Sequence, residues 1–205
     1  MRTEPVSLFS RPVAATLLLL AITACAADPI AESEHYLDLS DDPMEASATE
    51  LTTVEGETWT FTDVADDRLT LLYFGYTSCP DVCPMTMAEI NLALQEEGVD
   101  DDAYDVVMVT TDPARDTDEQ LRTWLDRFNP EFQGIRGDID HVVDAANDYG
   151  IAVDPPVETE GEYLVTHGGR ITVLTPDGKA AGSFDEGINA DQLAELLPTL
   201  QDDLL

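Results

Sequence analysis

Basic residues are scarce in this sequence, which has 9 Lys and Arg against 43 Asp and Glu and a formal net charge of -34. A surface this acidic repels nucleic acid and anionic membranes, so nucleic acid is excluded as a partner. The acidic residues are spread along the chain, which favours adaptation to a salt-rich, halophilic habitat over a binding site for one basic partner. In molar salt the Debye length falls to about 3 Å, which screens repulsion between carboxylates.

Long hydrophobic runs are also lacking. The run Val13–Ile22 is too short to span a bilayer comfortably as a mature helix, and with two arginines before it and small residues after it, it is typical of a signal peptide. Because residues 22–25, Ile-Thr-Ala-Cys, resemble a lipobox, we expect Cys25 to be lipidated. The protein would then be held by lipid alone at the extracytoplasmic face of the cell membrane. A cleaved signal with an incidental cysteine is the alternative.

Only three cysteines are present, and lipidation of Cys25 leaves Cys79 and Cys83 as a pair. They lie where a buried strand is expected to lead into a helix, and the N–H groups and dipole of a helix start favour the thiolate. A thiolate serves either soft-metal binding or thiol–disulfide exchange. A structural disulfide is a third possibility, although a ring this small restricts the unfolded chain little and would stabilise the fold only weakly. The spacing is wider than the Cys-x-x-Cys that is typical of dithiol oxidoreductases.

The remaining chain divides into two parts. Residues 26–48 are acidic and lack a hydrophobic period, which predicts a flexible solvated tether. Residues 49–205 have the length of one domain and enough hydrophobic residues for a core.

Hydrophobic patterning in residues 49–205 alternates between strand and helix periods. The sequence predicts an α/β, thioredoxin-like fold, with a central mixed sheet flanked by helices and an added N-terminal hairpin. The expected strands are 51–54, 59–64, 69–74, 104–109, 132–136, 169–174 and 179–184. One expected helix has Pro84 in its first turn, and the next follows the capping box of Thr117 and Gln120. A third helix carries Ile139, and the last opens at Asn189 and Gln192.

Three motifs resemble those of the Sco/SenC family of copper chaperones for cytochrome oxidase. The first is residues 74–84, Phe-Gly-Tyr-Thr-Ser-Cys-Pro-Asp-Val-Cys-Pro. The second is residues 111–117, Thr-Asp-Pro-Ala-Arg-Asp-Thr, and the third is residues 163–167, Tyr-Leu-Val-Thr-His. They occur in the family's order over about residues 51–197.

The resemblance implies that Cys79, Cys83 and His167 bind a copper ion, as Cu(I), Cu(II) or both. Two thiolates and an imidazole suit copper, although zinc uses the same groups. The glycines at 168 and 169 leave the backbone free to swing the imidazole towards the cysteines, which is compatible with a ligand on a mobile loop. Asp112 is expected either to hold a hydrogen bond in the shell around the site or merely to cap the next helix. Family members often have Asp before the ligand His, where this chain has Thr166.

The resemblance also implies delivery of copper to the dinuclear copper site of cytochrome c oxidase subunit II. The alternative is an enzyme, a thiol–disulfide oxidoreductase that reduces the copper-ligand cysteines of the oxidase, for which Cys79 and Cys83 would be the catalytic pair. His167 separates the two hypotheses, because a reductase does not need it. Both require an unidentified copper donor or thiol reductant.

Overall fold

The computed structural model describes residues 30, 33–63, 67–159 and 162–205. The predicted signal peptide and Cys25 lie outside the described residues. In the part of the chain that is described, no helix is both long enough and apolar enough to cross a bilayer.

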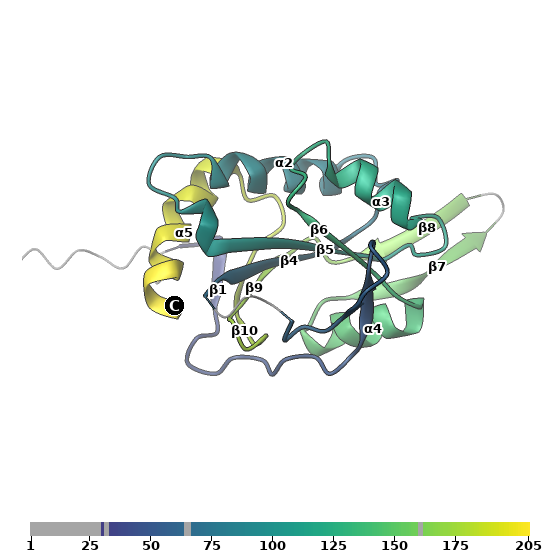
Figure 1. The fold of residues 1–205 in the computed structure, drawn as a ribbon, viewed down its shortest axis with the longest axis horizontal. Coiled ribbons are helices and arrows are strands. Elements are labelled where there is room, and N and C mark those ends of the chain that lie inside the picture. Colours follow the sequence, from purple (N-terminus) through teal and green to yellow (C-terminus); the bar gives the residue numbers. More distant parts are fainter. Residues whose placement is uncertain (1–29, 31–32, 64–66, 160–161) are drawn as a thin grey trace, which may run out of the picture.

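A mixed sheet of eight strands forms the centre of the molecule, in the order β1-β10-β9-β4-β5-β6-β2-β3 (Figure 1). Its central strands β4 and β5 are parallel and almost wholly buried, which explains their nearly continuous hydrophobic sequences. The strands are β1 (Tyr36–Asp38), β2 (Leu51–Thr53), β3 (Thr58–Trp59), β4 (Leu69–Gly75), β5 (Tyr104–Thr110), β6 (Gln133–Arg136), β9 (Ile171–Leu174) and β10 (Ala180–Phe184).

Helices cover both faces of this sheet. Along β4, Leu71 and Tyr73 pack on the side of α2 (Val82–Leu94), α3 (Asp118–Leu125) and α5 (Ala190–Leu204). Leu72 and Phe74 point to the opposite side, where α4 (Ile139–Asp148) lies. Alternation along the strand thus builds two hydrophobic clusters, one on each face.

The predicted fold class is confirmed. The mixed sheet has flanking helices, and β2 and β3 form the added N-terminal hairpin. The predicted capping box of Thr117 and Gln120 is present at α3. Asn189 and Gln192, which were expected to open the last helix, form a second capping box at α5.

The segment predicted as a solvated tether differs from that prediction where it is described. Strand β1 pairs antiparallel with β10, and the Tyr36 ring is buried against Phe184 with ring centroids 4.9 Å apart. Ser47 is also buried, and its backbone N–H donates to the Tyr149 hydroxyl. A local hydrophobic period is absent here because single side chains, rather than one face of an element, make the contacts.

A second, two-stranded sheet was not expected from the sequence. It consists of β7 (Val153–Thr159) and β8 (Glu162–His167), which pair antiparallel (Figure 1). Strand β7 contains Pro155 and Pro156, and its register shifts between Asp154 and Val157. Two prolines argue against a strand in sequence reasoning, but an edge position with a bulge accommodates them.

Candidate metal centre

The two cysteines lie at the carboxyl end of β4. Strand β4 ends at Gly75, Cys79 follows in the connecting loop, and Cys83 lies in the first turn of α2. Cys79 is partly exposed and Cys83 is fully buried, and both are free thiols. The backbone N–H of Cys83 approaches the Cys79 sulfur at 3.4 Å, so an unpaired donor of the helix start is directed at Cys79.

Gly75 permits the close approach of Cys83 to the end of β4. A Cβ atom at this position would lie 3.2 Å from the Cys83 sulfur and 2.5 Å from Cε1 of Tyr73. Any larger residue would therefore displace the thiol or the tyrosine ring. Glycine is required here for space, and not for an unusual backbone angle.

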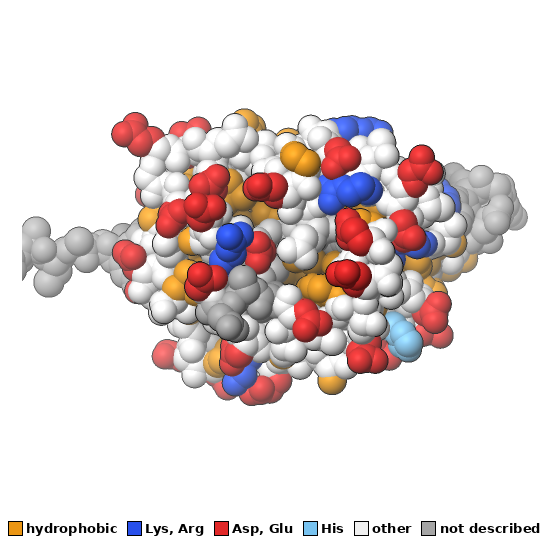
Figure 2. Space-filling model, in the orientation of Figure 1, with side chains coloured by type: hydrophobic (Ala, Val, Ile, Leu, Met, Phe, Trp, Pro, Cys, Tyr) orange, Lys and Arg blue, Asp and Glu red, His pale blue; other side chains and the backbone are white. Residues whose placement is uncertain are grey.

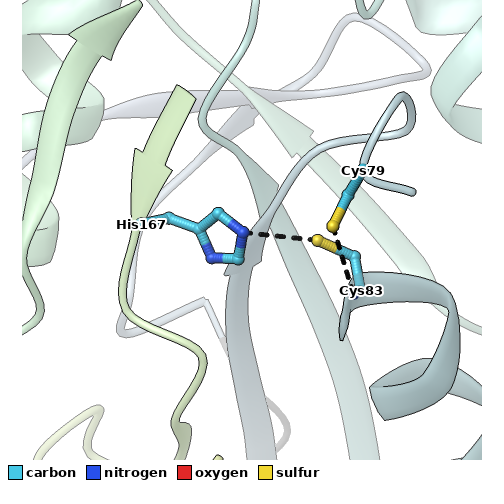
Figure 3. Close-up of side chains that lie close together, drawn as sticks. All are labelled: Cys79, Cys83 and His167. Carbon is cyan, nitrogen blue, oxygen red and sulfur yellow. Dashed lines mark hydrogen bonds between the residues drawn. The ribbon is translucent and has the colours of Figure 1, made fainter. Parts of the chain in front are cut away.

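His167 approaches the cysteines from the second sheet. It is the last residue of β8, and β9, which follows shortly after, pairs antiparallel with β4, so the chain reaches the same sheet end. Figure 3 shows its ring directed at Cys83, with Nε2 3.4 Å from the Cys83 sulfur. His167 lies in a strand rather than in a loop, because it pairs with Val153 in the hairpin and the Gly168 N–H donates to the Ala152 carbonyl at 2.8 Å.

The surroundings of the His167 imidazole favour Nε2 as the nitrogen that binds a metal. Nδ1 lies 3.4 Å from the Gly168 carbonyl oxygen, a partner that can only accept a hydrogen bond. A proton on Nδ1 leaves the lone pair of Nε2 directed at the thiols. The rings of Tyr73 and Tyr76 pack edge-on against the imidazole, with centroids 6.1 and 5.5 Å away.

The three donor atoms fit a single metal ion. The two sulfurs and a ring nitrogen all lie within 4.8 Å of one another. A sulfur and a nitrogen bound to one first-row ion at about 2.3 and 2.0 Å are roughly 3.4–3.7 Å apart at angles of about 105–120°. The 3.4 Å between Cys83 Sγ and His167 Nε2 meets this requirement, and thiolate donors favour a soft ion.

Burial changes the titration of two of the three groups. Desolvation raises the pKa of Cys83 to about 12, although the Tyr76 backbone acts in the opposite direction, so without metal this cysteine favours the thiol. Burial also lowers the pKa of His167, although the Gly168 carbonyl and the charge of Glu186 oppose the change. Both shifts favour uncharged groups. A bound cation would supply the charge that stabilises the Cys83 thiolate.

Two buried carboxylates follow β5 in the neighbouring loop. The Asp112 side chain is completely buried and pairs with Arg115. The alternative that Asp112 caps the next helix is wrong, because Thr117 caps α3. Its hydrogen bond within the shell around the metal centre stays a prediction.

Asp116 is the positioning residue that sequence reasoning missed. Its buried carboxylate accepts the Thr77 N–H at 3.0 Å, the Thr77 hydroxyl at 2.5 Å and the Thr110 hydroxyl at 2.5 Å. It thereby ties the loop that carries Cys79 to the end of β5. Asp116 is part of the second quoted motif, but its partner 39 residues away has no local signal.

Comparisons with known proteins agree with these features. A model of the SCO1/SenC family matches residues 40–201. A Stutzerimonas stutzeri protein named as copper-binding is 33% identical over 193 residues, which cover 91% of this chain and 94% of that protein. The structure of Bradyrhizobium japonicum ScoI with copper bound is 28% identical, with a TM-score of 0.65, and the match covers 78% of this chain and 99% of that one.

Some relatives are longer than this chain. Protein sco1 of Schizosaccharomyces pombe is 28% identical over 134 residues, which are 63% of this chain and 51% of that protein. The chain thus matches about half the length of this relative.

Proposed function

Because this chain belongs to the SCO1/SenC family, we propose that it is an extracytoplasmic copper metallochaperone that binds one copper ion through Cys79, Cys83 and His167. The observation that carries the proposal is the convergence of these two sulfurs and one ring nitrogen within 4.8 Å. The three groups come from two elements and a loop, and a purely structural role for the histidine does not explain why Nε2 faces a thiol.

The donor set favours copper as cargo. Two thiolates and an imidazole suit three-coordinate Cu(I), and a weak further ligand would allow Cu(II). The copper-binding name of the Stutzerimonas stutzeri relative and the copper in Bradyrhizobium japonicum ScoI support the same metal.

The different exposure of the ligands suits transfer of the cargo. Cys83 is wholly buried, whereas Cys79 and His167 are partly exposed. An acceptor thiol would therefore reach copper from the side of Cys79 and His167, and Cys83 would be the last ligand released. We propose that the acceptor is the dinuclear copper site of cytochrome c oxidase subunit II, the target that the sequence resemblance implies.

The alternative function is reduction of the copper-ligand cysteines of that oxidase. One observation favours it, namely that Cys79 and Cys83 are both free thiols, with their sulfurs inside the same 4.8 Å cluster. The two thiols would form a disulfide and pass two electrons and two protons to a target disulfide. A separate thiol reductant would then restore the pair.

The location belongs to the same proposal. Lipidation of Cys25 would place the domain at the extracytoplasmic face of the membrane. There it would need a copper donor and, in an oxidising compartment, a thiol reductant.

The test titrates Cu(I) into the reduced protein against a competing chelator. We expect one copper per chain for the wild type and at least a tenfold weaker affinity for Cys79→Ser and His167→Ala. His141→Ala is the matched control, because His141 is an exposed histidine on α4. Equal affinity of the wild type and His167→Ala would overturn the three-ligand site. Reduction of an oxidised subunit II peptide by the metal-free protein would support the alternative.

A further inference from the structure

The Tyr73 side chain is completely buried beside the metal centre. It lies on β4, two residues before Gly75, and its ring packs edge-on against the His167 imidazole. Among the described residues its hydroxyl makes no hydrogen bond. The Cys83 thiol and the Thr86 hydroxyl lie beside this oxygen, although neither forms a hydrogen bond with it.

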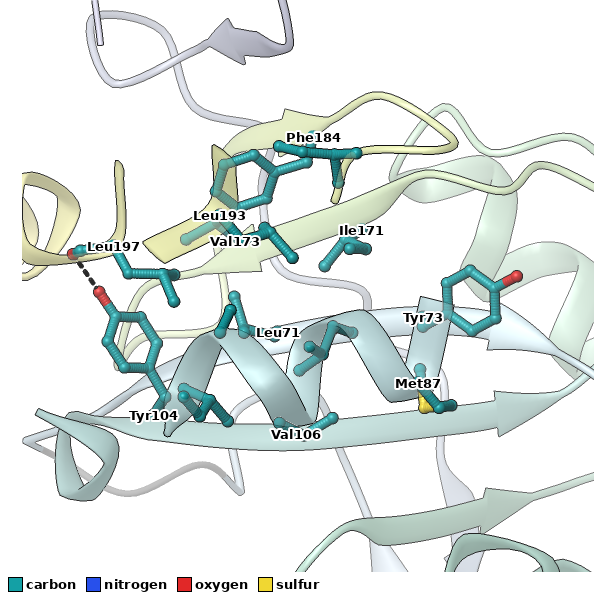
Figure 4. Packing of buried hydrophobic residues seen from close by; sticks show 14 of the residues in the cluster. Leu71, Tyr73, Met87, Tyr104, Val106, Ile171, Val173, Phe184, Leu193 and Leu197 are labelled. Carbon is teal, nitrogen blue, oxygen red and sulfur yellow. Dashed lines mark hydrogen bonds between the residues drawn. The ribbon is translucent and has the colours of Figure 1, made fainter. Parts of the chain in front are cut away.

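An unpaired buried hydroxyl is unusual, since buried polar groups nearly always have a partner. Other buried tyrosines of this protein follow the rule. The Tyr104 hydroxyl donates to the Leu197 carbonyl, and the Tyr149 hydroxyl donates to the Gly178 carbonyl at 2.9 Å. Figure 4 shows Tyr104 bonded to α5, whereas the Tyr73 hydroxyl points away from the other labelled core residues.

The neighbouring groups leave the Tyr73 proton available. A tyrosine hydroxyl carries its proton at neutral pH, so the Tyr73 hydroxyl can donate. The Thr86 hydroxyl donates to the Val82 carbonyl at 3.0 Å, and its oxygen takes no hydrogen bond from Tyr73. A protonated Cys83 thiol is a weak acceptor, but a copper-bound Cys83 is a thiolate, and hydrogen bonds to charged groups are stronger.

We propose that Tyr73 is a positioning residue of the copper centre, whose hydroxyl donates a hydrogen bond to the Cys83 thiolate when copper is bound. This inference rests on the proposed function, since it needs a metal-bound thiolate. The unpaired hydroxyl then belongs to the metal-free state, and copper binding supplies its partner.

The hydrogen bond has consequences that can be measured. It withdraws electron density from the sulfur, which moves the thiolate-to-Cu(II) charge-transfer band to higher energy and raises the Cu(II)/Cu(I) potential. It also stabilises bound copper without stabilising the metal-free fold.

The experiment compares Tyr73→Phe with the wild type and with Tyr104→Phe. The matched control removes a buried hydroxyl at the opposite end of the paired strands β4 and β5. For Tyr73→Phe we expect an unchanged or higher melting temperature without metal, about tenfold weaker Cu(I) binding, a charge-transfer band at longer wavelength and a lower potential. For Tyr104→Phe we expect a lower melting temperature and unchanged copper properties.

The possible outcomes separate the two proposals. Wild-type affinity, band position and potential in Tyr73→Phe would overturn the hydrogen bond and leave the copper site intact. A lower melting temperature of metal-free Tyr73→Phe with an unshifted band would assign Tyr73 a structural role and also overturn the inference. A wild-type protein that binds no copper would overturn the proposed function, and the hydrogen bond with it.

Discussion

At the scale of single residues, the two cysteines of the centre have different surroundings. Cys79 is partly exposed in a loop and faces the N–H of a helix start, whereas Cys83 is fully buried. Burial, the largest cause, raises the pKa of Cys83 to about 12. The two thiols therefore differ in exposure and in their tendency to ionise in the metal-free protein, a difference that their spacing in the sequence does not predict.

Alkylation of the metal-free protein tests this inequality. At pH 8 we expect iodoacetamide to label Cys79 at least tenfold faster than Cys83, because only the thiolate reacts and Cys83 is both buried and protonated. Labelling of Cys83 should keep accelerating as the pH rises through 9 and 10. Mass spectrometry of peptides measures both rates, and the unfolded protein, in which both sites react alike, is the control. Faster labelling of Cys83 would contradict the assignment.

Asp116 supports a second prediction at this scale. Replacing it by Ala leaves three donors near the cysteine loop without their acceptor, which should lower the free energy of unfolding by about 2 kcal/mol. Copper affinity should also fall, because the Cys79 loop is released from β5. Asp126→Ala is the control, since Asp126 is exposed and its pair with Arg122 should contribute less than about 1 kcal/mol. Urea unfolding and chelator competition measure the two effects, and equal losses in both variants would refute the role.

At the scale of elements, the described residues 33–48 form part of the folded domain. Strand β1 closes one edge of the sheet, and its Tyr36 lies over Gly182, where a Cβ atom would come within 2.0 Å of the hydroxyl. The separate β7–β8 hairpin positions a ligand, because it places His167 opposite Cys83. Neither element follows from hydrophobic periodicity.

Shortened chains test the contribution of β1. A chain that begins at residue 49 loses the Tyr36 contacts, which should reduce the free energy of unfolding by about 2–3 kcal/mol relative to a chain that begins at residue 30. Urea unfolding measures the difference. In the longer chain, Tyr36→Ala should reproduce most of the loss, whereas Leu37→Ala should not, because Leu37 is 46% exposed. Equal urea-unfolding midpoints for the two chains would support the original prediction that residues 26–48 are a flexible tether.

At the scale of the whole molecule, acidic charge far exceeds basic charge. Six basic side chains of the described residues already pair with carboxylates, namely Arg68, Arg115, Arg122, Arg136, Arg170 and Lys179. The many remaining acidic groups are spread over the face shown in Figure 2 rather than gathered at one place. Self-repulsion among them destabilises the compact state at low salt.

Salt should therefore stabilise the fold. Raising NaCl from 0.1 to 2 M at pH 7 should increase the melting temperature by about 5 °C or more, since 1 kcal/mol corresponds to about 2–4 °C in a domain of this size. Near pH 4 many carboxylates are protonated, and the increase should shrink. Thermal unfolding followed by circular dichroism measures both. A melting temperature that does not depend on salt at pH 7 would argue against the halophilic interpretation.

The sequence by itself determined which segments form the main strands and helices and where the cysteine pair lies. Those features depend on contacts between near neighbours: the two-residue period of strands, the helical period and the capping boxes at Thr117 and Asn189. The cysteines follow the same logic, because a strand that leads into a helix is a local event.

Only the tertiary structure decided how the centre is completed. His167 lies 84 residues from Cys83 and Asp116 lies 39 residues from Thr77. Both meet their partners because the strand order brings separate segments to one end of the sheet. The unpaired Tyr73 hydroxyl and the raised pKa of Cys83 likewise depend on burial, which no local pattern determines. The family resemblance named His167 as a ligand, but only packing between segments distant in sequence places it beside Cys83 and buries that thiol.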